Sequence, residues 1–354
     1  MSSNIHRMQL PREVIIGNGS LQLVSDVCRK LGLSENGLII TGLTTKQVAA
    51  QRVADLLRDA GMEVDCHIVS SNTPTMDDVR QAEEAIGKLK PHVVFGVGGG
   101  TKIDIAKLSS ARKETPFISV PTSASHDGMA SPFASIKGLD RPYSIKAQSP
   151  MAVVADTEVI INVPYRFIAS GCADVISKFT STRDWKLAYE KKSEYYAQYT
   201  ASLALMSAQH IVENADLFKP GSEAGLRVLL EALVSCGVAM CIGGTSKPCS
   251  GSEHLFSHAL DIVAPNRALH GEECGLGAIM MAELHGMKWE KIRDTLRKVG
   301  APVTAEKVGI SAEQIVEALL RAPKIRPERY TILNEKRLTR ETARELAKAT
   351  GVIR

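Results

Sequence analysis

The feature that most constrains the fold is an alternation of apolar runs and helical patterns that stops near Pro164. Five apolar runs typical of strands occupy 14–16, 38–40, 64–69, 93–95 and 117–120, with amphipathic helical patterns between them. Strands that alternate with helices favour a parallel sheet covered by helices on both faces. The first half of the chain therefore predicts an α/β fold with a Rossmann-like parallel sheet.

After Pro164 the strand-like runs disappear, and the sequence takes on the apolar spacing of long helices. These patterns span roughly 165–190, 194–217, 223–244, 251–263, 272–285, 288–299, 311–321 and 339–350. A chain of 354 residues is long enough for two domains. We expect an α/β domain over 1–163 followed by an all-α domain over 164–354.

Composition excludes several classes of protein. Lys and Arg number 43 against 39 Asp and Glu, and no basic run resembles a nucleic-acid patch. The seven cysteines are scattered without a CxxC pair, and no secretory segment is present, which predicts free thiols in a reducing cytoplasm. No apolar run reaches the roughly 18 residues that a membrane-spanning helix needs. We expect a cytoplasmic protein that binds no nucleic acid and does not insert into membranes.

A glycine-rich stretch from Gly96 to Lys102 follows the apolar run 93–95 and opens a helical pattern. Glycines let the backbone approach a phosphate closely, and a helix N-terminus offers N–H groups and a partial positive charge. The stretch is neither a Walker A loop nor a GxGxxG motif, because Thr101 precedes the lysine and the third glycine is missing. A tight strand–helix turn would need fewer glycines, so the pattern favours phosphate or pyrophosphate binding.

A polar loop from Pro121 to Gly128 follows the apolar run 117–120. Ligands in open α/β sheets bind at the carboxyl ends of the strands, so this loop and the glycine-rich stretch should share one crevice. The small hydroxyl side chains suit the phosphate or ribose of a cofactor, although an ordinary polar turn would have the same composition.

The helical half contains a set of histidines with the spacing of metal ligands. His254 and His258 are four residues apart and share a helix face, and His270 follows a loop. A lone histidine is more often a surface or packing residue. Asp174 has apolar neighbours on both sides, where a carboxylate is costly unless it is paired or metal-bound. The residues alone favour a metal ion held by these histidines and a carboxylate.

Together these stretches resemble the metal-dependent polyol dehydrogenases, a superfamily that includes glycerol dehydrogenase, iron-type alcohol dehydrogenases and dehydroquinate synthase. The motifs that carry the resemblance are Gly98 to Lys107, Pro121 to Asp127, Ala155-Asp156, Gly171 to Asp174, and His254 with His270. The 122–128 loop, 144–147, and 170–178 with the following Asp184-Trp185 are most similar to the archaeal-type sn-glycerol-1-phosphate dehydrogenases. The resemblance covers nearly the whole chain.

The resemblance implies a dehydroquinate synthase-like or glycerol dehydrogenase-like fold with Zn²⁺ between a dinucleotide-binding domain and a metal- and substrate-binding domain. It assigns the metal to Asp174, His254 and His270. It places His258 near the substrate, whereas spacing alone would make it a ligand. Substrate-binding and catalytic roles are implied for Asp127, Asp174 and His258. Contacts with NAD(H) or NADP(H) are implied for Gly99, Gly100, Thr101, Lys102, Asp104, Thr122, Ser123, Ser125 and Ser131.

The implied reaction is reduction of dihydroxyacetone phosphate to sn-glycerol 1-phosphate, which supplies the backbone of archaeal ether phospholipids. No acidic residue follows the run 38–40, so a 2′-phosphate should not be repelled there, and Lys46 could help to bind it. We expect both NADH and NADPH to be used. The substrate phosphate needs a cation or a nest of N–H groups, and Lys146 and Lys178 are both candidates. We also expect a homo-oligomer.

Three alternatives would share parts of this pattern. A glycerol dehydrogenase would keep the zinc site and act on an unphosphorylated polyol. Dehydroquinate synthase needs a more crowded basic site, and the Asp127 loop and the short helical domain argue against it. A regulatory nucleotide-binding protein would have no reason to retain all three metal ligands.

Overall fold

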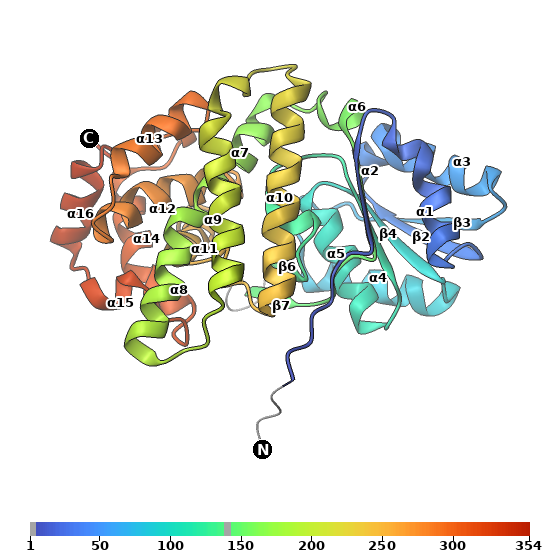
Figure 1. The fold of residues 1–354 in the computed structure, drawn as a ribbon, viewed down its shortest axis with the longest axis horizontal. Helices are drawn as coiled ribbons and strands as arrows, with labels where there is room; N and C mark the ends of the chain where they lie inside the picture. The colour runs from blue at the N-terminus through green and yellow to red at the C-terminus, as the bar shows by residue number, and fades with distance from the viewer. Residues whose placement is uncertain (1–4, 138–142) are drawn as a thin grey trace.

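A six-stranded parallel sheet forms the centre of the N-terminal half (Figure 1). The computed structural model describes residues 5–137 and 143–354. The strand order is β1-β8-β5-β4-β2-β3. The strands are β1 (Glu13–Gly17), β2 (Asn36–Thr41), β3 (Glu63–Ile68), β4 (Val93–Gly98), β5 (Phe117–Pro121) and β8 (Ala152–Asp156). All five strands predicted from the apolar runs are present, so the predicted α/β sheet is confirmed.

Short and long helices connect these strands. They are η1 (Ser20–Leu23), α1 (Val24–Leu31), α2 (Leu43–Thr45), η2 (Lys46–Ala50), α3 (Gln51–Asp59), α4 (Met76–Leu89), α5 (Gly100–Arg112), η3 (Asp127–Met129) and α6 (Thr157–Ile160). Successive residues of a strand point to opposite faces of the sheet. Leu38 and Ile40 of β2 therefore join a core that continues into the helical half, while Ile39 packs into a separate core with α1 and α3.

The sequence pattern did not single out three strands. An antiparallel pair, β6 (Phe133–Ile136) and β7 (Tyr143–Lys146), follows η3, and β8 lies between β1 and β5. The β8 segment contains two alanines and ends in an aspartate, so it lacks the run of large apolar residues that identified the other strands.

The second half is helical, and its described residues contain no strand after Asp156. Its elements are α7 (Tyr165–Ile176), α8 (Lys178–Lys192), α9 (Gln198–Glu213), η4 (Ala215–Leu217), α10 (Glu223–Gly243), α11 (Ser252–Val263), α12 (His270–Leu284), α13 (Trp289–Lys298), η5 (Ala305–Val308), α14 (Ala312–Ile325), α15 (Ile332–Lys336) and α16 (Arg340–Ala349). The helix expected over 165–190 is two helices that meet at Ser177. The short α15 was not expected.

Helix α10 stands between the strands and the C-terminal helices in Figure 1. Among the described residues it alone has the length and composition of a membrane-spanning helix, with a mean hydropathy of 1.8 despite Arg227 and Glu231. Of its most apolar window, 61% is buried inside the fold. Its apolar residues are therefore largely used in packing between the two halves.

Candidate active site

A cavity of about 610 Å³ is lined by residues from both halves of the molecule. The predicted site residues that line it are Gly99, Gly100, Thr101, Lys102, Asp104, Ser123, Ser125, Asp127, Ser131, His254, His258 and His270. Thr122 and Asp174 are buried beside these residues without lining the cavity. The fold therefore gathers residues that are up to 171 positions apart in the sequence, from Gly99 to His270, around one space.

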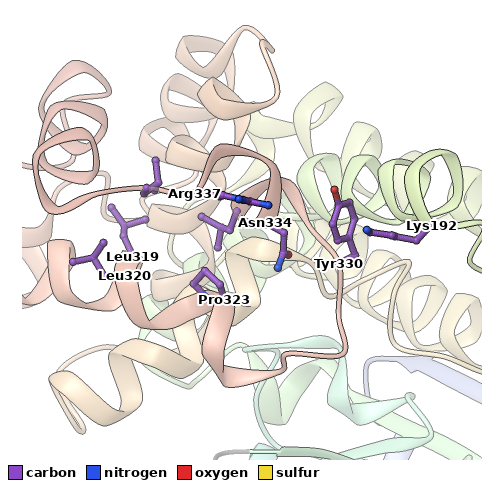
Figure 2. Close-up of a pocket in the computed structure, with 9 residues that line it drawn as sticks. Lys192, Leu319, Leu320, Pro323, Tyr330, Asn334 and Arg337 are labelled. Carbon is purple, nitrogen blue, oxygen red and sulfur yellow. The ribbon is translucent and has the colours of Figure 1, made fainter.

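A second cavity, of about 440 Å³, lies within the helical half (Figure 2). Its apolar lining includes Leu319, Leu320 and Pro323 of α14, and Tyr330 and Lys192 lie next to each other in its wall. The ammonium of Lys192 lies 4.7 Å from the centre of the Tyr330 ring. None of the predicted site residues lines this cavity.

The N-terminus of α5 forms one end of the larger cavity. Gly99 is the residue that caps this helix. Apart from its chain neighbours, a Cβ added at Gly99 would meet only Ser123 Oγ within 4 Å, at 3.3 Å. A Cβ at Gly100 would instead strike the His126 ring. The open space before Gly99 and the first N–H groups of α5 fit a pyrophosphate.

Asp104 has both carboxylate oxygens engaged within the protein. Oδ1 accepts a hydrogen bond from Lys107 at 3.2 Å, and Oδ2 accepts one from the Ser135 backbone at 3.0 Å. The buried Lys107 also donates to the carbonyls of Gly128 and Phe133, at 2.6 and 2.7 Å. Asp104 and Lys107 thus fasten the loop after β5 and the β6 strand to α5.

The side chain of Lys102 lies beside Gly42, just after the end of β2. A Cβ at Gly42 would lie 2.6 Å from Lys102 Cε, and Lys102 donates to the Ser71 carbonyl. Burial lowers the pKa of Lys102. Lys46, expected to help bind a 2′-phosphate, does not line the cavity.

The other end of the cavity carries a cluster of metal-ligating side chains. Asp174, His254, His270 and Cys274 each place one donor atom so that all four atoms lie within 4.8 Å of one another. His254 Nε2 is 3.5 Å from Asp174 Oδ1. His258 is outside this group. Carboxylate, imidazole and thiol donors in a buried, closely spaced set suit Zn²⁺, so the residues present fit a zinc ion.

Two glycines allow the helices of this cluster to approach closely. A Cβ at Gly171 in α7 would lie 2.0 Å from the Ala124 carbonyl oxygen, in the loop after β5. A Cβ at Gly271 in α12 would lie 1.9 Å from the Ser170 carbonyl oxygen of α7. A side chain at Gly271 would therefore push α12 away from α7, and one at Gly171 would push α7 away from the loop after β5.

Lys178 is fully buried between two carboxylates. Its Nζ lies 2.6 Å from Asp174 Oδ1 and 3.0 Å from Asp127 Oδ2. The Asp127 backbone N–H donates to Asp174 Oδ2 at 2.9 Å. Lys146 is exposed and does not line the cavity. Neither lysine expected to hold the substrate phosphate is therefore placed to do so: Lys178 is enclosed with its carboxylates, and Lys146 lies elsewhere.

The charges of this group reinforce one another. Burial alone would raise the pKa of Asp174, but Lys178 and His254 outweigh it and hold that pKa well below its usual range. Burial would lower the pKa of Lys178, but Asp127 and Asp174 outweigh it and hold that pKa well above its usual range. Burial and the nearby charge of Asp174 raise the pKa of Asp127. Asp174 is thus held in its charged form beside His254.

Glu253 orients His254 and was not recognised in the sequence. His254 Nδ1 donates to Glu253 Oε1 at 2.8 Å, which leaves Nε2 facing Asp174. Glu253 also accepts from the Gly251 backbone at 2.7 Å and from Thr180 Oγ1 at 2.8 Å. An acid beside a histidine in a helix is usually solvated, so only the packing reveals its role.

His258 and Lys137 meet at Asp261 on the cavity wall. His258 Nδ1 lies 3.9 Å from Asp261 Oδ2, and Lys137 donates to Asp261 Oδ1. Burial lowers the pKa of His258, outweighing the opposite effect of Asp261. Lys137, at the end of β6, is a cation of the cavity that the sequence did not indicate.

Comparison with known proteins places the chain in a family. Residues 15–164 match the sequence profile of the family described as iron-containing alcohol dehydrogenase. A relative from Methanosarcina mazei, named glycerol-1-phosphate dehydrogenase, NAD(P)+, is 52% identical over 98% of this chain and 96% of its own length. A relative of the same name from Thermococcus kodakarensis is 51% identical over the whole of both chains.

Solved structures show the same fold at low identity. The crystal structure of glycerol dehydrogenase from Schizosaccharomyces pombe superimposes with a TM-score of 0.79 at 19% identity, over 98% of this chain and 91% of that chain. The fold is therefore that of the glycerol dehydrogenases and iron-type alcohol dehydrogenases. With about half of its residues identical to curated relatives over its full length, the chain belongs to the glycerol-1-phosphate dehydrogenase family of NAD(P)-dependent oxidoreductases.

Proposed function

We propose that this enzyme uses NADH or NADPH and a zinc ion to reduce dihydroxyacetone phosphate to sn-glycerol 1-phosphate, for the backbone of archaeal ether phospholipids. The observation that carries the proposal is one cavity lined by the α5 N-terminus and by His254 and His270, with Asp174 buried next to these two histidines. The names of the full-length relatives support the phosphorylated substrate.

The proposal divides the work between the two halves of the chain. Residues 1–163 would form the dinucleotide-binding domain, and residues 164–354 would form the metal- and substrate-binding domain. The cofactor contacts would be those implied at Gly99 to Lys102 and in the loop after β5. Asp104, whose carboxylate oxygens are engaged by Lys107 and the Ser135 backbone, and the buried Thr122 would hold this end of the cavity in shape.

A bound zinc ion would supply a Lewis acid for the carbonyl oxygen, and the reduced nicotinamide would supply the hydride. His258, which faces the cavity four residues after His254, would provide the proton for the product hydroxyl. Asp127, held by Lys178, would orient the substrate. These roles require side chains at the cavity wall, where the structure has His258 and Asp127.

Lys137 replaces Lys146 and Lys178 as the candidate for the substrate phosphate. It lines the cavity beside His258, with which it shares Asp261. A lysine held by one carboxylate at the edge of a cavity retains ammonium hydrogens for a phosphate oxygen.

The test is an assay of NADH and NADPH oxidation with dihydroxyacetone phosphate and dihydroxyacetone side by side, followed by chiral analysis of the product. We expect turnover with the phosphorylated substrate, with both cofactors, and a product of the sn-1 configuration. Equal or better turnover of dihydroxyacetone would favour a glycerol dehydrogenase. Removal of metal by a chelator should abolish the activity, and added Zn²⁺ should restore it.

We further propose that the enzyme is a cytoplasmic homo-oligomer. Large apolar side chains are exposed on the segment before β1 and on α9, with Ile5 78% and Tyr199 72% exposed. Exposed apolar side chains that gather into one patch mark contacts between subunits. Light scattering on the purified protein would test this assembly, because a monomeric mass would contradict it.

A further inference from the structure

The loop between α10 and α11 contributes three residues to the wall of the active-site cavity. They are Ser246, Cys249 and Ser250. The proposed function gives them no role. The loop is fastened to α8, where Ser181 Oγ donates to the Pro248 carbonyl at 2.8 Å. Its serine hydroxyls are therefore presented to the cavity by a backbone that is held in place.

Arg329 holds both serines of this loop. Its Nη1 donates to the Ser250 hydroxyl at 3.0 Å and to the Ser250 carbonyl at 2.5 Å, and its Nη2 donates to the Ser246 hydroxyl at 2.8 Å. Arg329 is only 6% exposed and comes from the segment between α14 and α15. A planar guanidinium fixes the positions of the groups that it binds. The two hydroxyls are therefore held near each other at the cavity wall.

The hydrogen bonds from Arg329 determine what these hydroxyls can offer to a ligand. A serine hydroxyl has one hydrogen to donate and lone pairs to accept. Each hydroxyl oxygen already accepts an N–H of Arg329, and neither hydroxyl donates to another group within residues 5–137 and 143–354. Each therefore keeps its own hydrogen for a ligand in the cavity. The pair can donate to one ligand oxygen.

The positive charge behind these serines is offset by carboxylates. Burial and the nearby Arg326 lower the pKa of Arg329 to about 9, although the charges of Glu253, Glu328 and Asp184 oppose this. Three acidic side chains therefore accompany the guanidinium. Two hydroxyl donors in front of an offset charge suit an uncharged hydroxyl group better than a phosphate dianion.

The place of the serines along the cavity indicates which hydroxyl they bind. Cavity residues follow the chain in the order Ser250, His254, His258 and Asp261. The last three lie in α11, where a rise of about 1.5 Å per residue puts Asp261 roughly 10 Å beyond His254. Asp261 holds Lys137, the candidate for the substrate phosphate. A substrate with its carbonyl near His254 and its phosphate at Lys137 turns its hydroxymethyl end towards the serines.

We infer that the hydroxyls of Ser246 and Ser250, oriented by Arg329, bind the hydroxymethyl oxygen of dihydroxyacetone phosphate. The inference rests on the proposed function, because it concerns the same substrate. The two serines touch the substrate, and Arg329 is a positioning residue. Holding the hydroxymethyl end as well as the phosphate end fixes which face of the carbonyl meets the hydride. The serine pair thus selects substrates that carry a hydroxyl at this end.

The test compares dihydroxyacetone phosphate with hydroxyacetone phosphate, which differs only in lacking this hydroxyl. Wild-type enzyme should prefer dihydroxyacetone phosphate by about 3- to 10-fold in kcat/KM, as expected for a hydrogen bond between neutral groups. Ser250→Ala should reduce this preference, and Ser246→Ala/Ser250→Ala should abolish it. Ser144→Ala is the matched control, because it removes a hydroxyl of the same cavity on β7 and should keep the preference.

Arg329→Lys tests the positioning role. Lysine keeps the positive charge but lacks the planar fork that binds both serines. The preference for dihydroxyacetone phosphate should therefore fall, while the zinc content and the KM for NADH stay the same. If this variant does not fold, the serine variants still decide the inference.

Three results would overturn the inference and leave the proposed function intact. One is an unchanged preference in the double serine variant. Another is a loss of activity with dihydroxyacetone phosphate but not with dihydroxyacetone, which would place the phosphate at the serines. The third is a higher KM for NADH alone, which would place the serines at the cofactor. A wild-type enzyme that does not reduce dihydroxyacetone phosphate would overturn both.

Discussion

The two ends of the active-site cavity are built differently. The dinucleotide end is centred on one continuous stretch at the end of β4, from Gly96 to Lys102, with the loop after β5 beside it, and would act mainly through backbone groups. The metal end assembles side chains from three helices, α7, α11 and α12. A substitution in a site that acts through backbone groups should weaken cofactor binding without abolishing it. A site made of several buried side chains should instead lose its ion when one donor is removed.

The largest effect should follow loss of a metal ligand. His254→Ala removes a nitrogen held between Glu253 and Asp174 and leaves buried acidic groups without their partner. We expect bound zinc and activity to be lost together, with turnover reduced by about 10³-fold or more. Zinc should restore chelator-treated wild type but not the variant. Stoichiometric zinc with normal turnover in the variant would show that the ligand assignment is wrong.

His258→Ala should separate catalysis from metal binding. Because His258 lies outside the donor cluster, the variant should keep its zinc. Loss of an acid–base group typically costs about 10²- to 10⁴-fold in turnover. Metal analysis of the purified variant decides between the roles: protein without zinc would make His258 a ligand, and zinc-loaded protein with unchanged kcat would exclude both roles.

Gly99→Val should affect only the dinucleotide end. The added side chain would fill the space before α5, where Ser123 Oγ is the one near neighbour. Loss of a hydrogen bond to a charged group costs about 1.5–3 kcal/mol, which corresponds to about a 10- to 100-fold higher KM for NADH and NADPH alike. Zinc content should not change. Gly100→Val is a poorer test, because its side chain would displace His126.

Glu253→Gln should weaken the metal site without removing a ligand. The amide keeps the shape of the carboxylate but is a poorer acceptor for the His254 Nδ1 hydrogen. Loss of such a partner typically lowers metal affinity by about 10- to 100-fold. A competition titration with a chelator measures the change, and saturating zinc should recover most of the turnover. Unchanged zinc affinity would mean that Glu253 contributes to packing but does not orient His254 for metal binding.

Lys137→Ala should give the smallest effect and should depend on the substrate. We expect about a tenfold higher KM for dihydroxyacetone phosphate and little change for dihydroxyacetone, because only the first carries a phosphate. Lys146→Ala is the matched control, since Lys146 is exposed and outside the cavity. An equal effect of the two substitutions on the phosphorylated substrate would exclude Lys137 from phosphate binding.

Much of the fold could be predicted from the sequence because its signals are local. Runs such as 93–95 and 117–120 are large, apolar and flanked by glycine or proline, so β4 and β5 were recognisable. The β8 strand was not, since alanine and aspartate carry little strand signal outside the sheet that buries them. The break at Ser177 between α7 and α8 was also hidden, because both segments continue the same helical pattern.

The site was predictable where residue type and spacing were distinctive. The resemblance suggested Asp174, His254 and His270, and the structure gathers them. The role of Lys137 depends on its contact with Asp261 of α11, which no spacing reveals. Glu253 adjoins His254 in α11, but its burial against Thr180 of α8 shows only in the structure. Lys178 was misjudged because nothing local in the sequence shows that its ammonium is buried between two carboxylates.

The central claim is that one cavity holds the dinucleotide at α5 and the metal at the three helices. A crystal structure of the enzyme with zinc and NADH, with anomalous scattering recorded at the zinc edge, tests it most directly. The account predicts one zinc peak among Asp174, His254 and His270 and a pyrophosphate at the Gly99 end of the same cavity. Zinc bound elsewhere, or a dinucleotide in the cavity beside Lys192 and Tyr330, would contradict it.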